Sequence, residues 1–336
     1  MNTESHAPTR MQGRAAPCSP DCSNRPGLQA LWLLTAIAAA SASGGAGATE
    51  GGGNSYPVGV ETNYNGLMLP EGLHPFYYYA HYSASHSKDN AGNDNRQLAH
   101  FRIESDIVAA RLSYVWPGVT LLGAHLETRV VQAVAAVNVE AAVARPAPLG
   151  PLDRGGSRTG LADTAFSPLI LGWHGATLHQ TLGLDTHLKV GTYDSAERVN
   201  IGRNYYQFAP FYAFTWFPSK TWDLNAKLRY ARNTRNTATD YQSGDEATLE
   251  FSAGYHPTPS LAFGLNGYVY RQTTNDTQHG VVVNGNGNRG SVNAIGPYLS
   301  YAITPKVTFM VKVQTEFNAR NRPEGTRIWA QARIPF

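Results

Sequence analysis

Charged residues occur in the middle of segments that otherwise alternate between apolar and polar side chains. Lys227 and Arg229 alternate with apolar residues in WDLNAKLRY, and Lys312 and Glu316 do the same in KVTFMVKVQTEF. A period of two residues puts the charges on one face of a strand and the apolar side chains on the other. Such charges tune which solutes pass when their face lines a channel, and they are simply solvated when their face covers a soluble sandwich.

The same pattern gives a set of candidate residues for a solute passage. Their signs are mixed, which indicates paired charges lining a constriction more than a selective ring of one sign. Structural pairing and direct contact with a solute both remain open. The candidates are Arg102, Glu104, Lys227, Arg229, Glu250, Arg271, Lys312 and Glu316.

Catalytic and metal-binding patterns are weak by comparison. The chain has no Gly-x-Ser-x-Gly and no His-Glu-x-x-His sequence. His86 and Ser87 are neighbours, but they fall in a predicted loop where a hydroxyl would lack a dry pocket. The stretch 87–95 is rich in oxygen ligands and lacks the spaced carboxylates of a calcium loop. We therefore expect no enzyme activity, no metal site and no cofactor.

The elements that must position the charges are strands joined by connections of two kinds. Short turns bearing Pro or Gly alternate with long polar loops, and both the first and the last connection are long. This alternation predicts an all-β fold, a transmembrane antiparallel β-barrel of about 12 strands with long external loops and short periplasmic turns. The turns are predicted at 116–118, 173–177, 217–221, 256–260 and 303–306, and the loops at 85–99, 145–162, 193–204, 233–246, 273–290 and 318–325.

Aromatic residues and the last strand point to a lipid environment. Trp116, Trp216 and Trp222 fall beside short turns, where Trp favours the boundary between hydrocarbon and water. The final segment TRIWAQARIPF puts Ile328, Ile334 and Phe336 within an alternating apolar series. We interpret this series as the membrane-insertion signal that the barrel-assembly machinery recognises. The expected location is the bacterial outer membrane, with its lipid as a partner.

The N-terminal region precedes the barrel. Arginines followed by LQALWLLTAIAAASASGGAGA predict a cleaved signal peptide over residues 1–48, and both cysteines lie within it. Residues 49–75 are predicted to form a periplasmic segment that either enters the barrel as a plug or lies across its mouth. Residues 76–336 are the predicted barrel. The net charge of +3 comes without a basic cluster, so no nucleic-acid partner is expected.

Several segments resemble a known family, the outer-membrane proteins associated with the meta-pathway of phenol degradation. The matching pieces are SYPVGVETNYNGLMLPEGLHPFYYYAHYSA, LADTAFSPLILGWHG, NIGRNYYQFAPFYAFTWF, GDEATLEFSAGYH and FNARNRPEGTRIWAQARIPF. The resemblance covers roughly residues 55–336 and implies a membrane barrel presumed to aid uptake. It brings no catalytic residues with it.

Two functions follow as expectations. The first is an outer-membrane channel that assists the uptake of small hydrophobic or aromatic compounds. The alternative is a non-transporting barrel with a structural or surface role, and a lipid-modifying barrel enzyme is a less favoured third.

Overall fold

The computed structural model of the chain describes residues 53–304 and 306–334. The predicted signal peptide and Phe336 lie outside these residues. Apart from the short 3-10 helix η3 (Val283–Gly285), the regular structure of the described residues is β-strand. In the same ranges, no helix combines the length and the apolar character needed to span a membrane.

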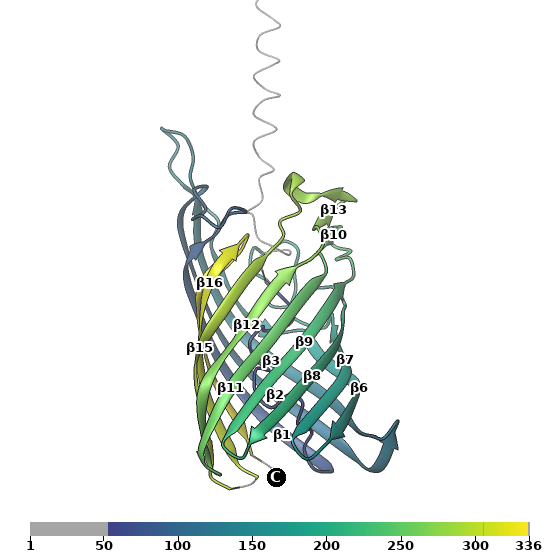
Figure 1. Cartoon of the computed structure of the whole chain (residues 1–336). Helices are drawn as coiled ribbons and strands as arrows, with labels where there is room; N and C mark the ends of the chain where they lie inside the picture. Colours follow the sequence, from purple (N-terminus) through teal and green to yellow (C-terminus); the bar gives the residue numbers. More distant parts are fainter. Residues whose placement is uncertain (1–52, 305, 335–336) are drawn as a thin grey trace, which may run out of the picture. The chain divides into compact units, whose positions relative to one another are not determined.

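Twelve long antiparallel strands form one closed barrel (Figure 1). The barrel closes because β1 pairs with β2 on one side and with β17 on the other. This confirms the predicted fold class. The strands are β1 (Gly72–Ser87), β2 (Leu98–Leu121), β3 (Ala124–Val143), β6 (Thr164–His174), β7 (Leu178–Leu188), β8 (Gln207–Ser219), β9 (Trp222–Asn233), β11 (Glu246–Thr258), β12 (Leu261–Gln272), β15 (Ser291–Ala302), β16 (Thr308–Arg320) and β17 (Pro323–Arg333).

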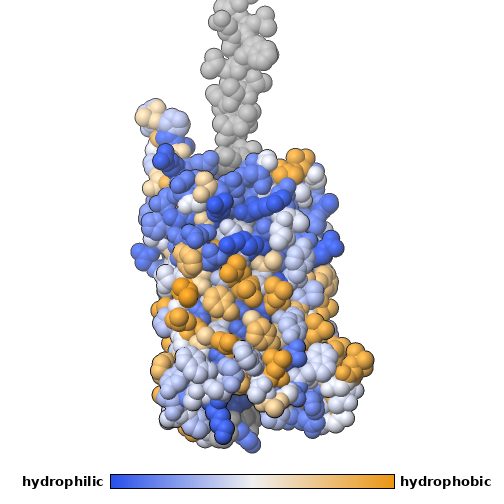
Figure 2. Space-filling view, in the orientation of Figure 1, coloured by the Kyte–Doolittle hydropathy of each residue, from blue (hydrophilic) through white to orange (hydrophobic). Residues whose placement is uncertain are grey.

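The two faces of each strand explain the barrel. In β9 the side chains of Lys227 and Arg229 are almost fully buried inside, whereas Leu228 between them is 56% exposed on the outside. On the face that Figure 2 shows, hydrophobic residues gather at middle height, and hydrophilic residues cover the end that carries the loops. Exposed large hydrophobic residues occur on all twelve barrel strands. A continuous exposed apolar belt of this kind needs hydrocarbon around it. The fold is that of a bacterial outer-membrane protein.

The β2–β3 hairpin differs from its prediction. The turn was expected at 116–118, but the strands continue to Leu121 and the chain turns at Leu122 and Gly123. Both turn residues have positive φ, 53° and 75°, as a two-residue type I′ hairpin turn requires. A register shift between Val115 and Thr120 absorbs the Trp-Pro-Gly stretch, so the Pro and Gly mark a bulge. Strand β1 likewise begins at Gly72, earlier than the expected barrel start at residue 76.

The long connections contain short strands. β4 (Leu152–Asp153) and β5 (Gly156–Leu161) both pair with β3, and β5 extends the line of β6 after a break at residues 162–163. β10 (Tyr241–Gln242), β13 (Thr277–Gln278) and β14 (Val281–Val282) form a separate small sheet. Figure 1 places β10 and β13 beyond the ends of the barrel strands, on the side opposite the short turns. The long and short connections thus lie at opposite ends of the barrel.

Candidate solute passage through the lumen

Residues 53–71, here called the lumen segment, run through the inside of the barrel. Tyr56 in this segment is only 6% exposed. At one end Asn54 borders a cavity together with residues of a long loop. At the other end the Glu71 carboxylate accepts a hydrogen bond of 2.8 Å from the backbone N–H of Gly118, near the turn side. The segment therefore passes from the loop side to the turn side, where β1 begins.

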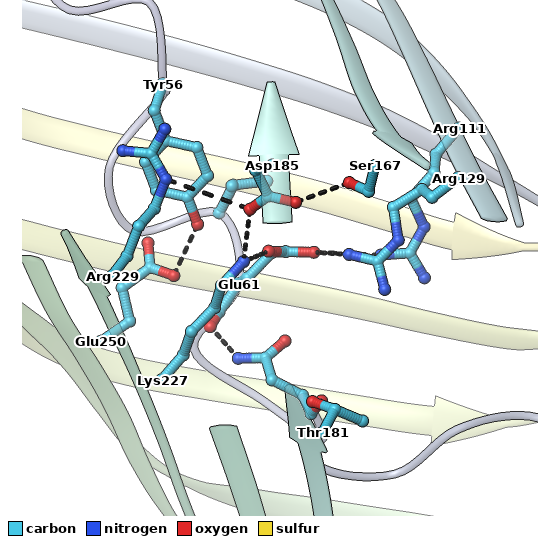
Figure 3. Close-up of polar contacts among 12 residues, drawn as sticks. Tyr56, Glu61, Arg111, Arg129, Ser167, Thr181, Asp185, Lys227, Arg229 and Glu250 are labelled. Carbon is cyan, nitrogen blue, oxygen red and sulfur yellow. Dashed lines mark hydrogen bonds and ion pairs between the residues drawn. The ribbon is translucent and has the colours of Figure 1, made fainter. Parts of the chain in front are cut away.

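Glu61 of the lumen segment is the centre of a buried ion cluster (Figure 3). Its carboxylate lies 2.7 Å from Arg129 Nη1 and 3.3 Å from Arg111 Nη1, and it also bonds Lys227 Nζ. Lys227 Nζ lies 3.1 Å from Asp185 Oδ2, so the cluster reaches strand β7. Three wall strands, β2, β3 and β9, thereby contact Glu61 directly, and β7 joins the cluster through Lys227.

The cluster is balanced in charge. Arg129 Nε lies 3.0 Å from Glu127 Oε1, and Arg229 Nε lies 3.9 Å from Asp185 Oδ2. Burial alone raises the pKa of the Glu61 carboxyl, but Lys227, Arg129 and Arg111 outweigh it and hold that pKa well below its usual range. Cations and carboxylates are equal in number: Arg111, Arg129, Lys227 and Arg229 face Glu61, Glu127, Asp185 and Glu250.

A second group of wall residues holds the backbone of the lumen segment. Lys312 Nζ donates to the carbonyl oxygen of Val60 at 2.7 Å, and Gln314 Nε2 donates to that of Gly59 at 3.0 Å. Gly59 has φ of +93°, and a Cβ there would lie 2.2 Å from Gln314 Oε1. Only glycine suits both the backbone conformation and the close approach. The segment is thus fixed by its main chain as well as by Glu61.

Glu250 and Glu316 are satisfied in different ways. Tyr56 Oη donates to Glu250 Oε2 at 2.7 Å, which ties this wall carboxylate to the lumen segment. Glu316 accepts hydrogen bonds from the hydroxyls of Tyr82, at 2.8 Å, and Tyr268, at 2.6 Å, which both belong to the wall. Glu316 therefore stiffens the barrel, whereas Glu250 takes part in holding the segment.

Among the predicted passage residues, one group lies inside the barrel. Lys227, Arg229, Glu250 and Lys312 surround the lumen segment, and Glu316 lies apart from them among tyrosines. All five are buried, with side chains on the lumen face of their strands. Whether they act on a passing solute stays a prediction.

Arg102 and Glu104 do not face the lumen, so their predicted orientation is wrong. Their side chains are 56% and 38% exposed and pair with each other at 2.6 Å on the outer surface. The inward positions of β2 are instead Ser105 and Ile107, which line a cavity. The upper part of β2 extends beyond the apolar belt, so its outward face there carries the polar residues Arg102, Glu104 and Asp106, while Ile103 and Ile107 point inward. The binary pattern of FRIESDIVAARL consequently does not reveal which face is inside.

Arg271 is also on the outer face. It is exposed near the loop end of β12, and its Nη2 donates to Asn293 Oδ1 at 2.8 Å. Its neighbours Tyr270 and Gln272 are the inward residues, with exposures of 0% and 6%. The lumen-facing residue at this level of β12 is therefore the buried Tyr270, whereas the prediction placed the charged Arg271 there.

Two cavities lie end to end along the lumen segment. The loop-side cavity has a volume of about 210 Å³ and the turn-side cavity about 330 Å³. Both are bordered by Val60, Glu61, Tyr78, Arg111 and Arg129. The Glu61 cluster therefore lies between the two cavities.

Comparison with known proteins places this geometry in a family. The model of the family described as "Putative MetA-pathway of phenol degradation" matches residues 85–332. The chain belongs to this family. No match was found among curated proteins.

An outer membrane channel and a hydrocarbon channel are among the solved structures similar to this family member. An outer membrane channel from Pseudomonas putida F1 has a TM-score of 0.68 at 14% identity, covering 81% of this chain and 98% of that one. A Pseudomonas aeruginosa FadL homologue has a TM-score of 0.37 at 10% identity, covering 84% and 94%. The CymD monoaromatic hydrocarbon channel has a TM-score of 0.39 at 9% identity, covering 79% and 88%. The first likeness supports the barrel fold.

Sequence reasoning on this family member missed the centre of the site. Glu61 was not selected, although it is the only charged residue between positions 53 and 70. That isolation is the signal available from sequence, because a lone acid in an apolar, Gly-rich segment that enters a barrel needs cations from the wall. Arg111 and Arg129 carry no comparable signal. In the described residues, no group of three or more His, Cys, Asp or Glu is arranged to hold a metal ion.

Proposed function

We propose that this chain is an outer-membrane channel that assists the uptake of small hydrophobic or aromatic compounds. The observation that carries the proposal is the pair of cavities on either side of the Glu61 cluster. The loop-side cavity is bordered on its β2–β3 wall by Ile107, Ala109, Val131 and Ala133. Small apolar side chains on that wall leave space that suits an apolar solute. The family's description, which names phenol degradation, agrees with this solute class.

The charges of the Glu61 cluster favour neutral solutes. Each cation of the Glu61 cluster is within 4.0 Å of a carboxylate, as in the contacts of Arg111, Arg129, Lys227 and Arg229. A passing ion would have to replace these pairs in a poorly hydrated space, which costs several kcal/mol. We therefore expect low ion conductance together with uptake of neutral rings.

A non-transporting structural barrel is the second candidate. The lumen segment favours it, because wall residues bind this segment along its length. A lipid-modifying enzyme has less support: the His86 side chain is 58% exposed, whereas Ser87 is 9% exposed, so the two lie in different surroundings and do not form a base and nucleophile pair. We infer a channel without catalysis.

Lipid and the assembly machinery are the partners that we propose for the outer surface. Ile328 and Ile334 are 43% and 41% exposed on the outside of the closing strand region. Outward apolar residues at alternate positions suit contact with lipid and with the machinery that inserts barrels. Phe336, the third residue of the predicted signal, is outside the described residues.

The test is uptake across an intact lipopolysaccharide-bearing membrane, because simple phospholipid vesicles are permeable to small aromatics. Cells of a Gram-negative host that lacks its own aromatic channels would express the chain, and short-time uptake of labelled toluene and phenol would be measured. A matched variant, Ala262→Phe, fills the turn-side cavity from an inward position that is 4% exposed. The control Leu265→Phe alters an outward position that is 54% exposed.

We expect the parent and Leu265→Phe to raise uptake above empty-vector cells, and Ala262→Phe to reduce that gain. Insertion of each protein is checked by its heat-dependent mobility on gels. Equal uptake by empty-vector cells and by cells with inserted parent protein would support the structural role in place of the channel.

A further inference from the structure

Several buried polar atoms at the loop-side cavity have no hydrogen-bond partner among the described residues, and one of them belongs to a histidine. His187 on β7 is 2% exposed, borders this cavity, and its Nδ1 is without a hydrogen bond to any residue that the structure describes. Its ring meets that of Tyr56 edge-on, with centroids 6.3 Å apart and planes at 81°. Leaving a buried polar atom without a hydrogen bond costs about 1–3 kcal/mol of desolvation free energy. A ligand group that forms a hydrogen bond with His187 Nδ1 would recover part of this cost.

Much of the wall that β1, β2 and β3 give to the loop-side cavity is apolar. The residues that face the space from β1, β2 and β3 include Ala80, Ile107, Ala109, Ala133 and Ala135. The cavity volume is about 210 Å³. An engineered apolar cavity of about 150 Å³ in another protein takes up benzene. The loop-side cavity therefore has room for one aromatic ring with a small substituent.

The charged residues at the cavity exclude an acidic ligand. Asp163 and Asp185 both border it, and the cations at the cavity already face carboxylates: Arg111 and Arg129 face Glu61, and Arg203 faces Asp163. A carboxylate would meet like charges and lack a spare cation, which disfavours its binding. A hydroxyl avoids this repulsion and can still form a hydrogen bond with a histidine nitrogen.

We infer that the loop-side cavity is a binding site for a neutral single-ring aromatic compound bearing a hydroxyl group, with His187 Nδ1 as the hydrogen-bond partner of that hydroxyl. The inference rests on the proposed function, since it names the solute that pauses in the passage. The ring lies against the alanines of β2 and β3, and the hydroxyl points to β7.

The experiment measures binding of phenol and of toluene to the barrel in lipid nanodiscs by ligand-observed NMR. The two ligands have similar shapes and differ in the hydroxyl. His187→Leu should weaken phenol binding about five- to tenfold more than toluene binding, as expected for one lost hydrogen bond. His187→Gln, which keeps a hydrogen-bonding group, should recover part of the preference for phenol.

A pair of alanine variants separates loss of the cavity from loss of the hydrogen bond. Ala135→Leu fills the cavity from an inward position that is 6% exposed, and it should weaken both ligands. The control Ala136→Leu places the same added volume on the exposed outer face of β3 and should change neither. Heat-dependent gel mobility establishes that each variant is folded.

The outcomes distinguish this inference from the proposed function. If His187→Leu lowers the affinity for phenol and toluene equally, or lowers neither, a water molecule satisfies His187 and the inference is wrong. Uptake of toluene by cells with the parent protein would in that case still support the channel. Conversely, selective phenol binding without any uptake would keep the binding site and overturn the channel.

Discussion

Replacing Glu61 with Gln tests whether the ion cluster holds the lumen segment in place. Gln has the same shape and lacks the charge, so Lys227, Arg111 and Arg129 lose a shared counter-ion. Removing one partner of a buried ion pair costs about 3–5 kcal/mol. The Glu61 side chain is only 12% exposed, so solvent screens little of this loss. Since about 1.4 kcal/mol is a tenfold change, the ratio of docked to released segment should fall by more than about 100-fold.

The assay is ion conductance of single barrels in planar bilayers. The parent should conduct weakly, because the lumen segment and its balanced charges obstruct ions. Glu61→Gln should show larger and more frequent openings as the segment leaves the lumen. The matched control is Glu71→Gln, which makes the same change in the same segment at an exposed residue that accepts one bond from Gly118.

The result that refutes this reasoning is equal conductance. If Glu61→Gln and Glu71→Gln both resemble the parent, the backbone bonds from Lys312 and Gln314 hold the segment by themselves. If both variants open alike, the effect arises from the segment's overall charge. Either outcome would remove Glu61 from its central position.

Two further predictions follow. The pKa of Glu61 is lowered when the lumen segment is docked in the barrel. Ionised Glu61 therefore contributes fully to docking above the usual carboxyl pKa of about 4.5, and this contribution is lost as the pH falls toward the lowered pKa. Conductance should therefore be constant between neutral pH and pH of about 5, rise in stronger acid, and lose this pH dependence in Glu61→Gln; a rise already at pH 6 would contradict the assignment. Leu228→Arg puts a charge on the outward face of β9, which costs about 2–4 kcal/mol near the bilayer midplane, whereas Arg229→Ala changes an inward residue. Urea unfolding in vesicles should show a lower unfolding midpoint for Leu228→Arg, while Arg229→Ala should insert normally and alter conductance; equal unfolding midpoints would contradict the orientation of this strand.

The barrel is predictable from sequence because each strand must serve two environments. In β9, the apolar Leu228 and the charged Arg229 indicate which face of the strand contacts lipid and which faces the lumen. The alternation of long and short connections indicates how the strands are ordered. The same logic fails where a strand leaves the membrane. Arg102 lies on the outer face because water, not lipid, surrounds that part of β2.

The site itself is harder to predict, because its partners are remote in sequence. The contact between Lys312 and Val60 joins residues 252 positions apart. No local sequence pattern connects these two residues. The period of two residues shows on which face of a strand a side chain lies, but it does not show which residue that side chain contacts. Glu61 is identified as a site residue only when the barrel brings Arg111, Arg129 and Lys227 around it.

The path of the lumen segment has a consequence for how the chain reaches its native state. The carbonyl of Val60 accepts from Lys312 on β16 and from Gln331 on β17, so the segment cannot complete its bonds until the last two strands arrive. The first strand, β1, closes against β17 as well. Ring closure and enclosure of the segment thus both depend on β17, through contacts of high sequence separation, which form slowly. Once the ring has closed, withdrawing the segment requires many lumen bonds to break together, so the closed form should be long-lived on kinetic grounds beyond its equilibrium stability.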